Sequence, residues 1–260
     1  MVTVQPKASI VAGLLALFFT SRAEAAKRRF EPTDLDLLEP GTLEIDLQTG
    51  YMKSQGPGRL VLPDGEINLG LLPNFEINLD FAVGLEGPEH GPYAIDHVTA
   101  DNLWLAVKLG LWDSRDPVRG TAWALGVQLG PKVPVAPGAR GAGYEALLLV
   151  GRTFRGVQLG LNVGGVIDPG AEVSRRRPIG IEVGLDVEVE LREGLSLLGE
   201  AGTTLYISPD RHALDASLGF QWSVNERLDL SLVGLFGFLP GSDRYGVLFG
   251  VTRRFELFHH

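Results

Sequence analysis

Side chains able to perform acid–base or nucleophilic chemistry are few in this 260-residue chain, and their spacing does not bring them together. Histidine occurs five times, and none of these residues falls inside a predicted strand: His90, His97, His212, His259 and His260. Serines do fall in predicted strands, but none occupies the GxSxG turn that presents a hydrolytic nucleophile. Hydrolysis needs a histidine or a carboxylate pair beside a nucleophile. We therefore predict that the protein is not an enzyme.

Cofactor and metal sites are not predicted either. The chain has no Cys, which excludes disulfides and thiolate zinc sites. The spacing of Glu89-His90 and Asp96-His97 could hold a divalent ion, but loop histidines are more often solvated, so we assign no metal ligand. Neither GxxxxGK[ST] nor a GxGxxG that opens a helix occurs. A formal charge of −9 argues against nucleic-acid binding, which requires a basic surface.

The first 25 residues have the pattern of a cleaved secretory signal peptide. Lys7 precedes an apolar run, IVAGLLALFF, and Ala23-Glu24-Ala25 supplies small residues before a cut after Ala25. A membrane anchor fits less well, because the run is about half of the roughly 20 residues that span a bilayer. Residues 26–41, with Lys27-Arg28-Arg29, show no periodicity, and we predict a periplasmic N-terminal tail there.

Alternation of apolar and polar residues fills the rest of the chain. In 75–86, FEINLDFAVGLE, the residues Phe, Ile, Leu, Phe, Val and Leu fall on one face, and Glu, Asn, Asp, Ala, Gly and Glu fall on the other. Only a strand sorts residues in this way, since a helix would scatter them. The segment 179–192 shows the same sorting. Applied along the chain, the pattern predicts about twelve strands: 42–53, 65–72, 75–86, 100–112, 121–133, 143–154, 157–167, 178–192, 195–207, 213–224, 228–239 and 245–256.

The predicted connections alternate between short and long. Pro73-Asn74, Arg155-Gly156 and Glu193-Gly194 are tight, whereas the intervening connections, such as 54–64 and 87–99, are longer. Short turns at one rim and longer loops at the other are typical of bacterial outer-membrane barrels. The connection 113–120 is too long for its rim. We predict an all-β fold, an up-and-down antiparallel transmembrane β-barrel of about 12 strands over residues 42–258.

Three features favour a membrane barrel over a soluble periplasmic all-β binding protein. Glycines crowd the polar face, where they would weaken a solvated sheet but leave room in a lumen. The last strand alternates apolar and aromatic residues and nearly ends the chain at Phe255, Phe258 being out of phase with that row. Aromatic residues also gather near strand ends, as interfacial girdles require: Tyr51, Phe75, Trp123, Trp222, Phe238, Tyr245 and Phe255.

The polar face carries the charges that are predicted to line the lumen. Acids predominate, and only four of the residues are basic. Two interpretations stay open: the charges pair across a filled lumen and hold the wall together, or they line a wet pore and bias which solutes enter. Glu145 and Arg152 are left unplaced, because the segment around them is apolar on both faces. The predicted lining residues are Glu44, Asp46, Glu76, Asp80, Glu86, Lys108, Lys132, Glu182, Asp186, Glu188, Glu190, Arg192, Glu200, Asp215, Asp229 and Arg254.

Several segments resemble a known family. The hairpin INLGLLPNFEINLDFAVGLE (67–86), the strand TAWALGVQLGPKVPVA (121–136), and VNERLDLSLVGLFGF (224–238) with YGVLFGVTRRF (245–255) are similar to the outer-membrane transporter-like MetA-pathway of phenol degradation family. The similarity covers most of residues 36–256. It implies a barrel that passes small molecules, aromatic or otherwise hydrophobic ones among them, and it transfers no catalytic or ligand residue.

The expected function is therefore a passive channel for small molecules in the Gram-negative outer membrane. Its expected partners are membrane lipid, the solute and the outer-membrane assembly machinery, and the oligomeric state is left open. The alternative is a structural barrel whose loops interact at the cell surface without transport.

Overall fold

The structure is a computed structural model that describes residues 37–53, 58–87, 97–116, 121–171, 177–207 and 212–258. The predicted signal peptide (1–25) and residues 26–36 of the predicted tail lie outside the described residues. So do Glu89, His90, Asp96, His259 and His260. Within the described ranges, no helix is long and apolar enough to cross a membrane.

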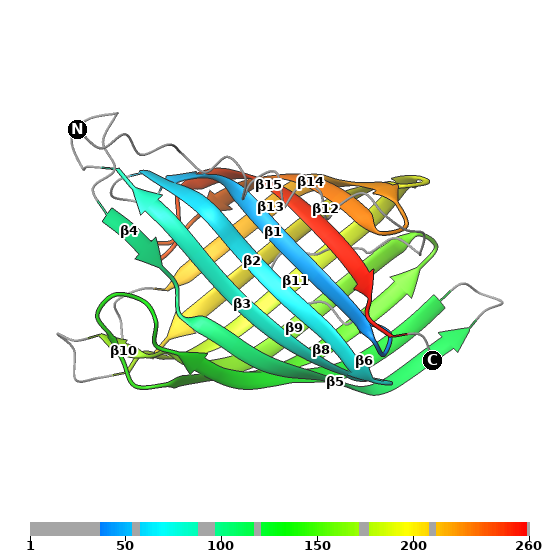
Figure 1. The fold of residues 1–260 in the computed structure, drawn as a ribbon, viewed down its shortest axis with the longest axis horizontal. Coiled ribbons are helices and arrows are strands. Elements are labelled where there is room, and N and C mark those ends of the chain that lie inside the picture. Colours follow the sequence, from blue (N-terminus) through cyan, green and yellow to red (C-terminus); the bar gives the residue numbers. More distant parts are fainter. Residues whose placement is uncertain are drawn as a thin grey trace, which may run out of the picture.

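Twelve long strands form a closed antiparallel barrel (Figure 1). Each long strand pairs with the next one along the chain, and β1 pairs with β15 to close the ring, from Thr42 opposite Glu256 to Lys53 opposite Tyr245. The predicted up-and-down barrel is confirmed. Its strands are β1 (Thr42–Lys53), β2 (Gly58–Leu72), β3 (Phe75–Glu86), β5 (Leu103–Asp116), β6 (Thr121–Val133), β8 (Gly143–Phe154), β9 (Val157–Ile167), β11 (Ile179–Arg192), β12 (Leu195–Tyr206), β13 (Ala213–Asn225), β14 (Leu228–Gly237) and β15 (Tyr245–Glu256).

The two rims of the barrel differ in their connections. At the turn-side rim, which is on the right in Figure 1, β8 and β9 are joined by Arg155-Gly156, both with positive φ. A type I′ turn requires that geometry, and it suits the twist of a hairpin. Longer connections and three short strands lie at the loop-side rim. β4 (His97–Ala100) pairs with β3, and β7 (Ala139–Arg140) pairs with β10 (Gly170–Ala171).

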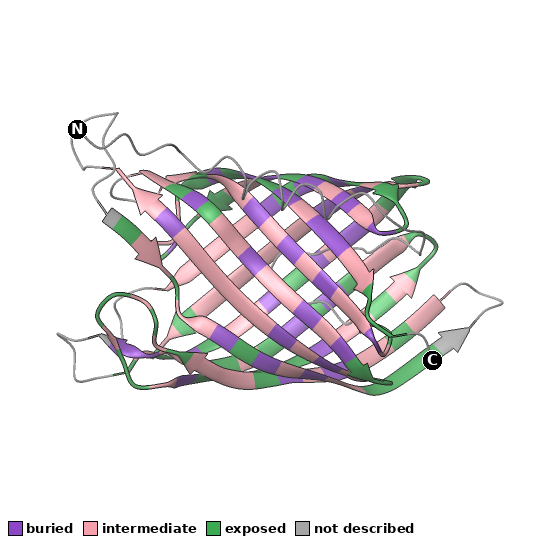
Figure 2. Cartoon of the chain, viewed as in Figure 1, coloured by how far each residue is buried: buried purple, intermediate pink, exposed green. Residues whose placement is uncertain are grey.

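The two faces of the wall differ in the way that the alternation predicts. On β11, Leu185 is 52% exposed, while the adjacent Asp186 is 2% exposed. Figure 2 shows buried residues alternating with more exposed ones along the strands. Most of the exposed large residues on the strands are aliphatic or aromatic, whereas the buried set includes many carboxylates and amides. An apolar outer surface around a polar interior is the arrangement of a transmembrane barrel.

Two strands differ most from their predicted bounds. β2 begins at Gly58 rather than at residue 65, because an irregularity between Val61 and Asp64 lets the strand pass Pro63. β5 spans residues 103–116 rather than 100–112, and its bulge between Gly110 and Trp112 keeps it paired with β6. Residues 113–116 of the expected long connection 113–120 are therefore strand, and β5 and β6 project beyond the turn-side rim (Figure 1).

Candidate functional site

The inner face of the barrel is the candidate site, because most of the buried charged side chains of the described residues gather there. Residues directly opposite each other on neighbouring strands point to the same face, so the strand register places each side chain. Seven of the sixteen residues named from the sequence are buried. Seven more are partly buried, and Glu190 and Arg192 are exposed at the turn-side rim. The buried ones are Glu44, Asp46, Glu76, Lys108, Asp186, Glu188 and Asp229.

Arg192 is the one predicted lining residue that the register places differently. The pairing of β11 with β12 shifts between Glu190 and Arg192, which brings Arg192 opposite Leu195. Leu195 in turn lies opposite Trp222, whose side chain is exposed on the outer face. A bulge adds one residue to a strand and reverses the facing of the residues beyond it. Arg192 therefore lies at the outer edge of the rim, which period-two counting alone could not predict.

One hydrogen-bonded network crosses the inner wall near the turn-side rim. Arg254 Nε on β15 lies 2.9 Å from a carboxylate oxygen of Glu44 on β1. Asn78 on β3 donates to both Asn68 on β2 and Glu76 on its own strand. These residues link four neighbouring strands, so their side chains hold the wall together as well as line it. Hydrogen bonds to charged groups contribute about 1.5–3 kcal/mol each when buried.

A second network lies toward the loop-side rim and centres on one lysine. Lys132 Nζ lies 2.6 Å from Glu145 Oε2 and 3.2 Å from Asp168 Oδ1. Asp168 also accepts a hydrogen bond from the Tyr206 hydroxyl, 2.5 Å away. Thr204 on β12 donates to Glu182 on β11 at 3.4 Å. The lysine thus ties the start of the connection after β9 to the inner wall.

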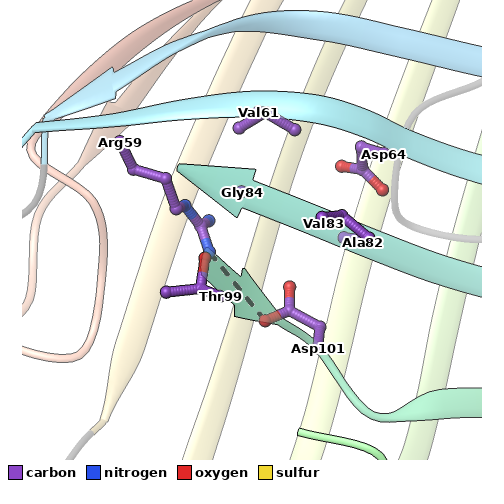
Figure 3. Close-up of a pocket in the computed structure, with 8 residues that line it drawn as sticks. All are labelled: Arg59, Val61, Asp64, Ala82, Val83, Gly84, Thr99 and Asp101. Carbon is purple, nitrogen blue, oxygen red and sulfur yellow. Dashed lines mark ion pairs between the residues drawn. The ribbon is translucent and has the colours of Figure 1, made fainter. Parts of the chain in front are cut away.

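At the mouth on the loop side, Arg59 reaches into a small pocket lined by β2, β3 and β4 (Figure 3). Its guanidinium lies 3.3 Å from Asp243 and 3.9 Å from Asp101, and it also donates to Met52 Sδ. Asp101 and Asp243 lie in different loop-side connections. Arg59 is therefore a cation at the loop-side entrance that holds two of those connections to the wall.

The inner face also carries an apolar patch. Trp104 and Ala106 on β5 cluster with Leu147 and Leu149 on β8, with Gln128 on the strand between them. Within the described part of the chain, neither Trp104 Nε1 nor Gln128 Oε1 has a hydrogen-bond partner. A second, smaller cluster joins Leu198 to Val233. The inner surface therefore combines charged networks with a defined aromatic and aliphatic area.

Sequence reasoning missed four charged residues of the inner face. Arg59 and Asp64 fell within a predicted loop, because Pro63 interrupts the alternation. Glu66 lies opposite both Asp46 and Asp80, and its place follows from the alternation of the second strand. Glu145 was left unplaced and is 8% exposed, beside Lys132. The structure resolves that ambiguity, since Leu147 and Leu149 occupy the interior while Leu148 lies outside.

The inner face carries a surplus of carboxylates. Among the described residues, no group of three or more His, Cys, Asp or Glu side chains is placed to hold a metal ion. Lys108 pairs with Glu76, Lys132 with Glu145 and Arg254 with Glu44, and the inner carboxylates outnumber these cations. Such a surface attracts cations from solution when water reaches it.

Comparison with known proteins gives matches in structure but not in sequence. No protein-family model and no curated protein matches the chain, so the resemblance to the MetA-pathway of phenol degradation family stays a prediction. Among solved structures, an outer membrane channel from Pseudomonas putida F1 is similar, with a TM-score of 0.62 and 11% identity, and the match covers 87% of this chain and 100% of that one. The NanC porin is also similar, with a TM-score of 0.56 and 9% identity over 82% of this chain and 100% of the porin. At these identities the likeness concerns the fold.

Proposed function

We propose that this protein is a passive channel for small molecules in the bacterial outer membrane. The observation that carries the proposal is the inner face of a closed 12-strand ring, where carboxylates, amides and Lys108 are buried in place of an apolar core. Twelve strands lie between packed eight-stranded barrels and open sixteen-stranded porins, so a narrow channel fits this ring. The shared fold with an outer membrane channel and a porin supports the same assignment.

The proposed route to the membrane uses both ends of the chain. Residues 1–25 would direct export as a cleaved signal peptide. The terminal strand β15, with Phe249 and Phe255 in its outward row, would be recognised by the outer-membrane assembly machinery. Lipid would then cover the exposed apolar side chains of the strands.

The proposed solutes are small, and aromatic or otherwise hydrophobic molecules are among them. The resemblance of residues 67–86 and 121–136 to the MetA-pathway of phenol degradation family supports this class, because it implies passage of such molecules. The charged residues of the inner face are proposed to line the path and to favour cations over anions.

Conductance in planar bilayers tests the channel directly. The chain has no native Cys, so Gly202→Cys places a single thiol on the inner face, where an added Cβ meets nothing within 4 Å. Leu218→Cys, on the outward face of the neighbouring strand, is the matched control. We expect discrete current steps that fall when a bulky thiol reagent modifies residue 202 and stay unchanged when it modifies residue 218. Absence of current, or equal block at both positions, would contradict the proposal.

A further inference from the structure

Two arginines lie on the outer side of the barrel at the turn-side rim. Arg152 on β8 stands four residues after Leu148, which faces outward, so the alternation of the strand places Arg152 on the same face. It lies opposite Trp123 on β6, whose side chain is 44% exposed. Arg155 follows in the turn to β9. The register therefore fixes the facing of Arg152, which the apolar sequence around it left open.

Aromatic rings hold both guanidinium groups in place. Arg152 Cζ lies 4.7 Å from the ring centroid of Trp123 and 5.9 Å from that of Phe154. Arg155 Cζ lies 5.2 Å from the centroid of the same Phe154 ring. A cation within about 6 Å of a ring face is attracted by the quadrupole of the ring. Two positive charges therefore share one ring, and their Cζ atoms are at most about 11 Å apart.

These ring contacts leave N–H donors available for a further group. Arg152, Phe154 and Arg155 are all exposed. Each guanidinium carries five N–H donors, and the face of an aromatic ring is only a weak acceptor. Within the described part of the chain, no ion pair joins either arginine to a carboxylate. Both groups therefore present positive charge and hydrogen-bond donors to whatever surrounds the barrel.

Other arginines at this rim lack one of the two features. Arg253 on β15 lies 5.7 Å from the ring centroid of Phe255, but it is only 3% exposed. Its guanidinium therefore packs into the wall. Arg192 on β11 is exposed at the outer edge of the rim, but among the described residues no aromatic ring contacts it. Exposure and aromatic support occur together at Arg152 and Arg155.

The depth of Arg152 matches the headgroup layer of a bilayer. It stands three residues before Arg155 in the turn, and a strand rises about 3.3 Å per residue, so the two lie within about 10 Å along the strand. Exposed rings such as Trp123 mark the membrane–water interface of barrels, where an arginine costs far less than at the midplane. The anionic groups at this depth are lipid phosphates, and the planar guanidinium fork matches two phosphate oxygens.

We propose that Arg152 and Arg155, supported by Trp123 and Phe154, bind the phosphate of an anionic phospholipid in the turn-side leaflet. A zwitterionic lipid carries its own ammonium group, which competes for that phosphate, so a lipid of net negative charge binds preferentially. The site is on the lipid side of the wall. Its occupancy therefore does not depend on whether the lumen conducts.

Quenching of tryptophan fluorescence by brominated lipid tests the site, because Trp123 is part of it. A chain with Trp112→Phe and Trp222→Phe reports from Trp123. A companion with Trp112→Phe and Trp123→Phe reports from Trp222, which is 55% exposed on the outer face. Trp104 faces the interior and stays in both. In phosphatidylcholine vesicles containing brominated phosphatidylglycerol, we expect phosphatidylglycerol to bind about fivefold more strongly than phosphatidylcholine at Trp123, and no more than about twofold more strongly at Trp222.

Arginine variants of the chain that reports from Trp123 test the residues themselves. Arg152→Gln combined with Arg155→Gln should lower the preference at Trp123 to about twofold or less. Arg192→Gln removes an exposed arginine of the same rim and should leave the preference unchanged. Heat-modifiable gel mobility would verify that each variant folds. Equal preferences at the two tryptophans with all arginines present, or a preference at Trp123 that the double variant does not change, would overturn the proposal.

Discussion

The outer and inner faces of the barrel wall are built from the same strands but specify the structure in different ways. On the outer face, Leu185, Leu218 and Leu232 are each more than half exposed and need only be apolar. On the inner face, Lys132 Nζ lies 2.6 Å from Glu145 Oε2 and 3.2 Å from Asp168 Oδ1, so each of these residues has a specific partner. The first face is defined by composition and the second by pairing.

This difference follows from the surroundings of each face. Lipid is uniform, so one aliphatic side chain can replace another on the outer face at little cost. In the interior, a charged side chain that loses its partner still carries the desolvation penalty of its burial. The attraction that offset this penalty is gone, so the fold is destabilised. On the outer face, replacing an apolar by a charged residue should therefore lower the free energy of unfolding most near the bilayer centre. On the inner face, the loss of stability should depend on which member of an ion pair is removed.

Leu185→Arg should give the largest effect. Leu185 is in the middle of β11 and 52% exposed on the outer face. An arginine there should lower the free energy of unfolding by about 2–4 kcal/mol, and the same change at Ile207, beyond the end of β12, should cost about 0–1 kcal/mol. A urea titration in lipid vesicles measures both. Equal costs at the two positions would show that Leu185 does not face the bilayer core.

Lys132→Met should give an intermediate effect on the inner face. It leaves Glu145 and Asp168 without their shared cation, and we expect a loss of about 2 kcal/mol in the free energy of unfolding. Adding Glu145→Gln should restore part of that loss, because the uncompensated carboxylate is then neutral. The same titration applies. A double variant as unstable as the sum of its two single variants would mean that the pair is not coupled.

The sequence predicts the facing of side chains on both faces, but it does not predict the pairing of charges on the inner face. Alternation alone predicted the strand pattern and the facing of Leu185 and Asp186, since parity needs only local sequence. It did not predict the partners of Lys132, because Glu145 and Asp168 come from other segments. It also missed Arg59 and misplaced Arg192, where an irregularity in register changes the phase.

The docking of residues 37–41 on the inner wall, where the Leu38 N–H donates to Glu76 Oε2 at 2.8 Å, is a further feature that the sequence did not reveal. These residues show no periodicity, and their place on the inner wall depends on Gly70 and Gly110, which lie 29 and 69 residues after Gly41. Glycines on the polar face indicated room in the lumen but not what fills it. Long-range fit of this kind becomes visible only when the ring is closed.

Ion selectivity should give the smallest effect, because it depends on the net charge of the inner face rather than on any one pair. Changing Glu182, Asp186, Glu188 and Glu190 to their amides removes four carboxylates from β11 while leaving the outer face untouched. If water fills the lumen, the cation preference should fall by no more than about 1 kcal/mol, or about fivefold in the permeability ratio. The reversal potential across a salt gradient measures it, and Glu193→Gln with Glu226→Gln, in exposed turns at the same rim, is the control.

Salt dependence separates the proposed mechanism from a steric change. The Debye length falls from about 10 Å at 0.1 M to about 3 Å at 1 M, so a preference caused by wall charge should weaken over that range in the unmodified protein. The amide variant should already show a weak preference at 0.1 M and change little as salt rises. An anion preference in the unmodified protein would mean that the excess of inner carboxylates does not govern permeation.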